Sequence, residues 1–158
     1  MENHQLDSMD EQILSMLIRN ARTPFLEIAR ACGVSGTAIH QRVQRLTSLG
    51  IIQGTEYKID PARIGYDTCA FVGLRINENA DLRKIVETLR DVPEVAEVHC
   101  TGEEYDLLVK LYAHDNSHLF ELIHAKLRPL GLTQTKVIVS LRMMVDKQPG
   151  LFPMKTPQ

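Results

Sequence analysis

The sequence lacks long apolar runs, paired cysteines and any large excess of charge. No stretch approaches the roughly 18 consecutive apolar residues of a membrane-spanning helix, so no membrane partner is expected. Residues 1–12 are polar and acidic, which does not fit a secretory signal. Cys32, Cys69 and Cys100 are widely spaced, and an odd number of cysteines indicates buried free thiols rather than a disulfide framework. We therefore expect a cytoplasmic protein.

Patterns typical of catalysis or metal binding are also missing. There is no glycine-rich phosphate loop and no Cys-x-x-Cys pair. His114 and His118 are four residues apart, but a helix is expected to start between them and no third ligand has a matching spacing. His99 and Cys100 are adjacent in an expected strand, where neighbours point to opposite faces. We expect no metal, no cofactor and no enzyme activity.

The net charge of −2 does not suggest a nucleic-acid binder, but the charges are unevenly distributed. Residues 1–11 contain four acidic residues, whereas residues 19–58 contain six basic residues and two acidic ones. DNA binding needs a local basic surface rather than a basic total. The uneven distribution therefore leaves DNA binding by the first part of the chain open.

Residues 7–50 show the spacing of three helices. Asp7 or Ser8 can cap the first helix, Gly33 suits the end of the second, and Ser35 suits the start of the third. The side chains expected to face inward from the first two helices are Ile13, Leu14, Leu17, Phe25, Ile28 and Ala29. Two short helices, a glycine-containing tight turn and a third helix match the helix-turn-helix unit.

The third helix has one apolar and one polar face. With Ile39, Val43 and Leu46 inward, the outward face has no acidic residue and offers groups that pair with base edges or phosphates. The residues expected to contact DNA are Ser35, Thr37, His40, Gln41, Arg42, Gln44 and Arg45. Among them, Arg42 is expected nearer the DNA backbone and Arg45 on a phosphate. The alternative is a polar face that contacts only solvent.

From residue 69 the apolar period changes to two, interrupted by helices. The expected strands are 69–76, 95–101, 105–112 and 137–145, and the expected helices are 81–90 and 116–127. The helical stripes expected to be buried are Leu82, Ile85, Val86, Leu89, Leu119, Phe120, Ile123 and Leu127. This β-α-β-β-α-β order is the ferredoxin-like arrangement, with both helices on one face of a sheet.

Both faces of this expected sheet carry apolar side chains. In the last strand one face has Val137, Val139, Leu141, Met143 and Val145, and the other has Ile138 and Met144. A sheet with one solvated face should alternate more cleanly. A second copy of the chain is the simplest cover for the free face, by two-fold symmetry. Such a dimer would present two recognition helices to a pseudo-palindromic DNA site.

These residues together resemble the Lrp/AsnC family, the feast/famine regulators, over about residues 6–145. In the first domain the resemblance rests on Leu6-Asp7-x-x-Asp10-x-x-Ile13-Leu14-x-x-Leu17, Asn20-Ala21-Arg22, Ile28-Ala29, Gly33-Val34-Ser35 and Arg42-Val43-x-Arg45-Leu46-x-x-x-Gly50-Ile51-Ile52. It continues with Ile59-Asp60-Pro61, Gly65-Tyr66, Thr101-Gly102 and Asp106-Leu107-Leu108-Val109. Each fragment alone is weak, but their shared order and spacing are specific.

The resemblance implies an α+β fold class, with an N-terminal winged helix-turn-helix and a C-terminal ferredoxin-like domain that senses an effector and dimerises. The expected domain boundaries are residues 1–60, a linker at 61–68, the sensing domain at 69–146 and a tail at 147–158. A short extended segment is expected within residues 51–59. In the tail, Phe152 and Met154 favour an arm across a neighbouring subunit over a free end.

The family also binds amino-acid effectors near the loop between the second and third strands of the sensing domain, at a subunit interface. Carried onto this chain, the effector residues are Thr101, Gly102, Glu104, Tyr105, Asp106, Thr133 and Thr135. The two threonines are expected just before the last strand. The loop departs from the family pattern, because Glu103-Glu104 makes it one residue longer and more acidic.

The function predicted from the sequence is a sequence-specific DNA-binding transcriptional regulator. Its assembly or DNA affinity is expected to respond to a small molecule, an amino acid, so the partners are double-stranded DNA, further copies of the chain and an effector. The resemblance includes octamers as well as dimers. Two alternatives remain: a ligand-sensing interaction module without DNA binding, and an enzyme like the tetrapyrrole decarboxylases that share this double-domain pattern.

Overall fold

The computed structural model describes residues 6–102 and 104–151. The chain divides into two compact units, one formed by Met1–Tyr57 with Val145–Gln158 and the other by Lys58–Met144. In the described ranges no helix is both long enough and apolar enough to cross a membrane.

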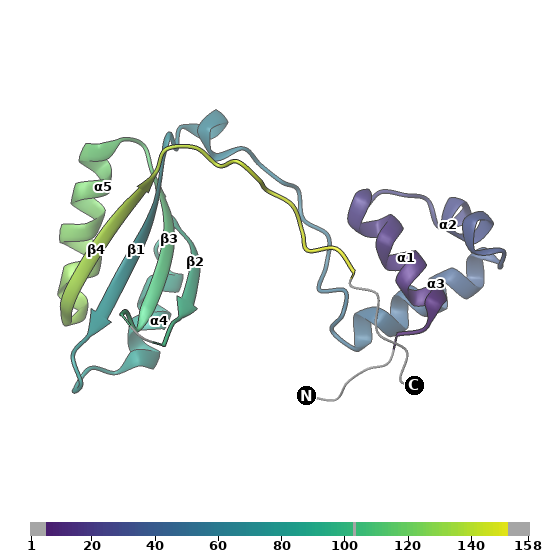
Figure 1. Cartoon of the computed structure of the whole chain (residues 1–158), viewed down its shortest axis with the longest axis horizontal. Coiled ribbons are helices and arrows are strands. Elements are labelled where there is room, and N and C mark those ends of the chain that lie inside the picture. Colours follow the sequence, from purple (N-terminus) through teal and green to yellow (C-terminus); the bar gives the residue numbers. More distant parts are fainter. Residues whose placement is uncertain (1–5, 103, 152–158) are drawn as a thin grey trace. The chain divides into compact units, whose positions relative to one another are not determined.

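The first unit contains α1 (Ser8–Arg19), α2 (Phe25–Cys32) and α3 (Gly36–Ser48), which Figure 1 labels. Asp7 caps α1 by accepting a hydrogen bond from the backbone N–H of Asp10 at 2.8 Å. Gly33 ends α2 with φ at 68°, a conformation that glycine adopts without strain, and Ser35 caps α3. The predicted caps and the tight turn between α2 and α3 are confirmed.

Apolar side chains from all three helices form the core of this unit. The buried members are Ile13, Leu14, Ile28, Ala29, Ile39 and Leu46, with Leu17, Phe25 and Val43 partly buried against them. The predicted inward faces are therefore confirmed. Leu151 also packs against this cluster, so the C-terminal segment contributes to the same unit. The predicted arm residues Phe152 and Met154 lie outside the described residues.

Residues 53–60 are assigned to neither helix nor strand. The short extended segment expected within residues 51–59 is therefore not part of a strand in the described chain. A strand is stabilised by ladder hydrogen bonds to a neighbouring strand, and no strand pairing of the described chain includes this segment. The chain then forms a short 3₁₀ helix at Pro61–Ile64.

The second unit contains β1 (Thr68–Ile76), α4 (Leu82–Arg90), β2 (Val95–Cys100), β3 (Leu107–Ala113), α5 (Asn116–Leu122) and β4 (Leu132–Ser140). Its sheet is antiparallel, with the strand order β2-β3-β1-β4. The predicted ferredoxin-like order is confirmed. Beyond α5 the chain continues through a π-helical turn at Ile123–Leu127 and a 3₁₀ turn at Arg128–Leu130.

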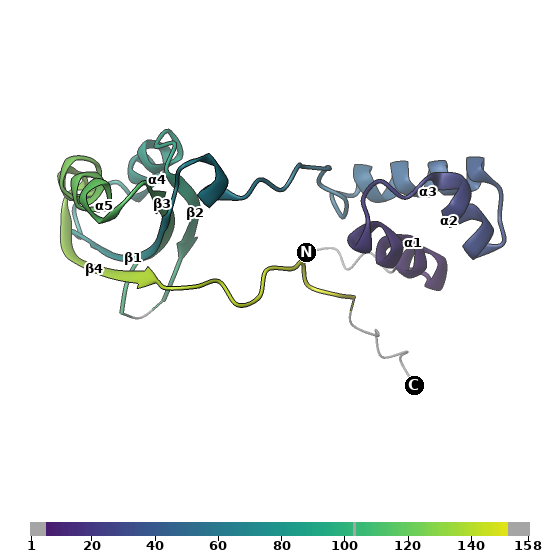
Figure 2. The ribbon, with the colours of Figure 1, turned by 90° about the horizontal axis from the view of Figure 1, so that it is seen from above.

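Both helices of this unit cover the same face of the sheet (Figure 2). The buried core between the two layers consists of Ala70, Val72, Leu74, Ile85, Leu89, Leu107, Val109, Leu111, Ala113, Leu119, Leu122 and Leu127. The alternate residues of β1 and β3, such as Phe71 and Leu108, point to the opposite face because side chains alternate along a strand. Within the described residues of this unit, no helix lies over that opposite face.

The last strand does not lie where the sequence pattern placed it. β4 begins five residues before the predicted start and ends at Ser140, so Leu141, Met143, Met144 and Val145 lie beyond it and are exposed. Pairing with β1 sets these limits: Ser140 pairs with Cys69 near the start of β1, and Leu132 pairs with Ile76 at its end. The alternating pattern after Ser140 finds no further partner strand in the described chain.

Two residues predicted to be buried on the helices are instead exposed. Phe120 is 61% exposed and Leu82 is 45% exposed. On α5, Leu122 takes the inward position together with Leu119, which turns Phe120 away from the sheet. On α4, Leu82 is the first residue after the Asp81 cap, where the helix has not yet reached the sheet core.

The cysteines are free thiols, as predicted, but they are not buried as predicted. Cys32 and Cys69 are half-buried, and Cys100 is exposed. Burial raises the pKa of the Cys69 thiol above its ordinary value. Cys100 is exposed because it is the last residue of β2, an edge strand of the sheet.

Candidate DNA-binding and effector sites

The helix α3 displays the residues predicted to contact DNA on one open surface. Its buried side chains, Ile39 and Leu46, face the core of the first unit. The exposed members of the predicted set are Ser35, Thr37, His40, Gln41, Gln44 and Arg45, and Arg42 is half-buried. The exposed His40 ring meets the Phe25 ring of α2 edge-on, with the ring centroids 5.9 Å apart. This surface is therefore accessible to a partner.

The arginines of α3 are held by two acidic residues of α1, a feature that the sequence analysis missed. Arg42 Nη1 donates to Asp7 Oδ2 at 2.6 Å and to Asp10 Oδ1 at 2.8 Å. Arg45 Nη2 donates to the other carboxylate oxygen of Asp10. The face of α3 itself carries no acid, as predicted, but α1 places two carboxylates beside it. In the sequence, Asp7 was interpreted as a candidate helix cap, and Asp10 only as one residue of the family motif.

These ion pairs change the electrostatics of the surface. The hydrogen bond from Arg42 holds the pKa of the Asp7 carboxyl below its ordinary value of 3.8. The bonds to Asp7 and Asp10 in turn raise the pKa of the Arg42 guanidinium. Two acidic and two basic side chains thus balance in charge. The arginines remain accessible, since a solvent-open hollow of about 480 Å³ is lined by Asp7, Ala38, Gln41, Arg42 and Arg45.

The predicted effector loop joins β2 to β3, and its backbone is anchored to β1. The N–H of Thr101 donates to the Asp106 carbonyl at 3.0 Å, and the N–H of Asp106 donates to the Leu74 carbonyl at 2.9 Å. Asp106 Oδ2 accepts a 2.7 Å hydrogen bond from the Ile76 N–H, while Oδ1 lies 3.7 Å from Arg75 Nη1. One oxygen of the Asp106 carboxylate is therefore committed to the fold.

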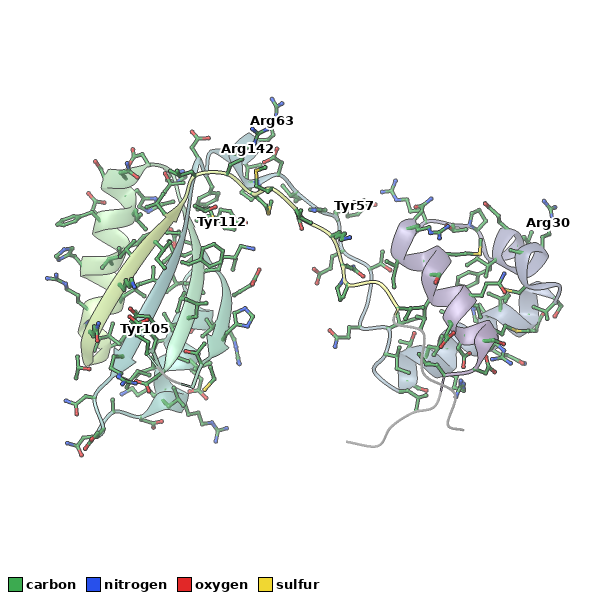
Figure 3. All side chains as sticks on the ribbon, viewed as in Figure 1. Arg30, Tyr57, Arg63, Tyr105, Tyr112 and Arg142 are labelled. Carbon is green, nitrogen blue, oxygen red and sulfur yellow. The ribbon has the colours of Figure 1, made fainter. Side chains whose placement is uncertain are left out.

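The ring of Tyr105 lies against Gly73 of β1, on the face of the sheet opposite α4 and α5. A Cβ atom on Gly73 would lie 2.7 Å from the Tyr105 ring, so only glycine allows this approach. The Tyr105 hydroxyl donates to Glu104, and Lys136 Nζ lies 3.6 Å from Glu104 Oε1. The hydroxyl's hydrogen bond lowers the pKa of Glu104 and raises the pKa of Tyr105. Figure 3 shows Tyr105 and Tyr112 towards opposite ends of the sheet.

The structure brings some of the predicted effector residues together and separates others. The Thr101 hydroxyl donates to the Tyr105 carbonyl, which joins it to Tyr105 and Asp106 in one cluster. Gly102 is exposed and has open space where a side chain would lie. Thr133 and Thr135 lie within β4 rather than before it, which corrects the prediction. Thr135 pairs with Leu74 and so points to the helix-covered face, away from Tyr105.

His114 and His118, considered above as metal ligands, stack on each other with ring centroids 4.8 Å apart. His114 Nδ1 donates to the Gly65 carbonyl at 2.6 Å, and its ring also stacks on Tyr66. His118 Nδ1 accepts from the backbone N–H of His114 at 3.1 Å. In the described residues no group of three or more histidine, cysteine or acidic side chains is placed to hold a metal ion.

A helix-turn-helix with an accessible polar recognition helix, in one chain with a ferredoxin-like domain, defines a two-domain regulator of transcription. Family models match an AsnC-type helix-turn-helix domain at residues 6–47 and an Lrp/AsnC ligand binding domain at residues 69–149. The chain belongs to the Lrp/AsnC family of transcriptional regulators. The resemblance and the α+β fold class predicted from the sequence are confirmed.

Individual relatives agree with this assignment. The chain is 34% identical over 140 residues to the regulatory protein AsnC of Haemophilus influenzae, which covers 88% of this chain and 93% of the relative. The structure of Escherichia coli AsnC superposes with a TM-score of 0.86 at 27% identity, covering 92% and 99% of the two chains. A transcriptional regulator of Neisseria meningitidis, solved in complex with L-Met, shares the fold with a TM-score of 0.84 at 21% identity, covering 90% and 94%.

Proposed function

We propose that this regulator binds double-stranded DNA through the polar face of α3. The set of contacting residues is Ser35, Thr37, His40, Gln41, Arg42, Gln44 and Arg45. The observation that carries the proposal is that Gln41 and Gln44 are exposed on the same helix as the anchored arginines. Glutamine amides read adenine edges and guanidinium groups bind guanine or phosphate, so the face combines sequence readout with positioning.

DNA binding by this face is tested by selecting duplexes from a random library with the full-length protein. Binding of the selected duplex is then compared with a scrambled duplex of the same length. Enrichment of a defined, pseudo-palindromic sequence supports the proposal. Failure to enrich any sequence would favour the alternative, a ligand-sensing module that does not bind DNA.

We further propose that the effector is an amino acid, bound at the Thr101–Asp106 loop. The loop offers an acidic oxygen on Asp106 for an ammonium group and exposed backbone at Gly102 for a carboxylate. The L-Met complex of the Neisseria meningitidis regulator supports this class of ligand. Thr133 and Thr135 are kept as proposed contacts from a neighbouring subunit, since Thr135 does not face the loop of its own chain.

A calorimetric titration with each of the common amino acids tests this second proposal. The test variant is Asp106→Asn, which keeps a side-chain oxygen to accept from the Ile76 N–H but removes the negative charge. Loss of the binding heat in this variant, with the fold intact, supports the loop as the site. No heat with any amino acid would count against an effector of this class.

We propose that the active form is an oligomer in the cytoplasm, built from a dimer in which two sheets face each other. The uncovered face carries the apolar side chains Phe71, Leu108, Tyr112 and Ile138. Lys110 and Glu97 form an ion pair across the same face with Nζ and Oε1 2.7 Å apart. Burial of large apolar side chains contributes roughly 1.5–3 kcal/mol each, which favours a second copy as the cover. Sedimentation at micromolar concentration tests it, and a monomer there would contradict the proposal.

A further inference from the structure

We propose that Asp10 is a positioning residue for DNA recognition: its carboxylate holds the guanidinium groups of Arg42 and Arg45 in fixed orientations on the recognition helix. The inference rests on the proposed binding of DNA by α3. It assigns a role in recognition to a residue of α1 that lies outside the surface predicted to contact DNA.

Asp10 occupies an unusual place for a charged residue. Among the described residues it is the one polar or charged side chain that is fully buried. One turn later on α1, Ile13 and Leu14 are part of the core, so the carboxylate is fixed to the rigid centre of the unit. A carboxylate is tolerated in such a position only when its oxygens are paired and hydrogen-bonded.

Both oxygens of the Asp10 carboxylate are used, and both face α3. Oδ1 accepts from Arg42, while Oδ2 accepts from Arg45 and, at 3.3 Å, from the backbone N–H of Asp7. Arg42 and Arg45 are three residues apart, so they are neighbours on one side of the helix. A single buried group therefore sets the direction of two long side chains of the recognition helix.

Asp7 and Asp10 bind the two arginines but do not use all of their hydrogen-bond donors. A guanidinium has five N–H donors, and the contacts to Asp7 and Asp10 use Nη1 of Arg42 and Nη2 of Arg45. The Arg42 side chain is 30% exposed and the Arg45 side chain 48% exposed. Both side chains line the open hollow together with Gln41, and each keeps donors that the two carboxylates do not use. These donors are available to a phosphate oxygen or a base edge.

Fixing these side chains in the free protein matters because an arginine has many rotamers. A binding partner must otherwise immobilise them, at an entropic cost that weakens association. A buried ion pair is also weak evidence for stability, since apolar residues of similar volume often stabilise a fold as well or better. Stability alone therefore does not explain why a carboxylate is buried at Asp10, whereas orienting Arg42 and Arg45 does.

A second role would act in the opposite direction. Asp7 and Asp10 balance the charges of Arg42 and Arg45, so they also reduce the general attraction of this surface for DNA. If screening were the only effect, removing the charge at Asp10 would strengthen binding to every duplex alike. If Asp10 only supported the fold, its removal would weaken binding to every duplex alike. Positioning predicts a change in discrimination between duplexes.

The experiment measures the affinity of the full-length protein for the selected duplex and for the scrambled duplex at several salt concentrations. The variants are Asp10→Asn, Arg45→Lys and the double variant, with Glu11→Gln as a control that makes the same change of charge one residue along α1. Circular dichroism and thermal unfolding report whether each variant folds. A wild-type protein that prefers neither duplex would refute the proposed function itself, which separates that failure from failure of this inference.

We expect Asp10→Asn to lower the ratio of the two affinities by about tenfold, a size typical of residues in one ion-pair network. The salt dependence should be no shallower than in the wild type, because both arginines keep their charge. Glu11→Gln should leave the ratio unchanged. An unchanged ratio in Asp10→Asn, whether both affinities rise or fall, would overturn the inference.

Arg45→Lys provides the test should Asp10→Asn fail to fold. It keeps the charge at an accessible position but loses the guanidinium group whose Nη2 binds the Asp10 carboxylate. We expect the ratio to fall while the salt dependence stays the same. Adding Asp10→Asn to Arg45→Lys should lower the ratio less than Asp10→Asn lowers it in the wild type, since part of the effect of Asp10 passes through Arg45 and the rest through Arg42. The positioning role would be refuted if Arg45→Lys kept the wild-type ratio of affinities for the two duplexes. It would also be refuted if the effects of Arg45→Lys and Asp10→Asn on that ratio were additive in the double variant.

Discussion

The ring of Tyr105 lies against the Cα atom of Gly73, in a space where a Cβ atom would be 2.7 Å from the ring carbons. This contact joins the loop that carries the proposed effector site to the central strand β1. Because the close atoms belong to the rigid ring near its attachment rather than to a flexible end, the ring must move if residue 73 gains a side chain.

Gly73→Ala should therefore displace Tyr105 and the loop between β2 and β3. We expect the free energy of unfolding to fall by about 1–3 kcal/mol, as for other overpacked sites, and the amino-acid binding heat to weaken. Chemical denaturation and calorimetry measure the two effects. The double variant Gly73→Ala, Tyr105→Ala removes the clash and should recover much of the stability. Equal stability of Gly73→Ala and the wild type would show that the ring can move freely.

Gln44→Ala tests base readout separately from attraction to phosphate. A good bidentate side-chain contact to a base contributes about 1–3 kcal/mol of discrimination. We expect weaker binding of the selected duplex, unchanged binding of the scrambled duplex and an unchanged salt dependence. Thr47→Ala is the matched control, because Thr47 is also exposed on α3 and its hydroxyl donates to the Val43 carbonyl of the same helix. An equal loss on both duplexes would assign Gln44 to the DNA backbone.

Asp7 should contribute to the acid stability of the first unit. Its pKa is lowered in the folded state by Arg42, so its stabilisation is fully present above the ordinary value of 3.8 and is lost as pH falls through the lowered pKa. Asp7→Asn keeps a good helix cap but removes the charge. We expect the variant to be less stable at neutral pH, with the difference from wild type shrinking below about pH 4. Chemical denaturation at several pH values measures this, and a constant difference would contradict it.

Ile138→Asp tests the proposed dimer face. Ile138 is 50% exposed and pairs with Phe71 on the face of the sheet that no helix covers. A buried charge there would oppose association, so we expect a shift towards monomer in analytical ultracentrifugation. Leu82→Asp is the control, because Leu82 is 45% exposed on α4, within the helical layer. If only Leu82→Asp caused dissociation, the dimer interface would lie on the helical layer rather than on the opposite face of the sheet.

Helix positions, and the helix ends set by cap residues, were predictable because they depend on neighbouring residues, whereas α5 ends at Leu122 rather than at the predicted Leu127. The i, i+3 and i+4 spacing located the cores of α1, α2 and α3, and the cap residues Gly33 and Ser35 act through their own backbone. The β-α-β-β-α-β order of elements along the second unit followed from the change of apolar period in the same way. The acid-free face of α3 also followed, since a helical face depends only on its own sequence.

Contacts between distant segments were not predictable from local pattern. Asp10 lies 32 residues before Arg42 and 35 before Arg45, so their ion pairs depend on how α1 crosses α3. The limits of β4 depend on its hydrogen bonds to β1, which end at Ser140 although the apolar alternation continues to Val145. The direction of Phe120 depends on which side of α5 meets the sheet.

The amino-acid sequence alone was enough to determine a helix-turn-helix followed by a β-α-β-β-α-β domain, because short-range periodicity and capping select the helices and strands. Only the folded arrangement decided that carboxylates of α1 hold the arginines of α3, and that Tyr105 rests on Gly73. Those relationships need side chains far apart in the chain to occupy the same few ångströms, and packing alone brings them there.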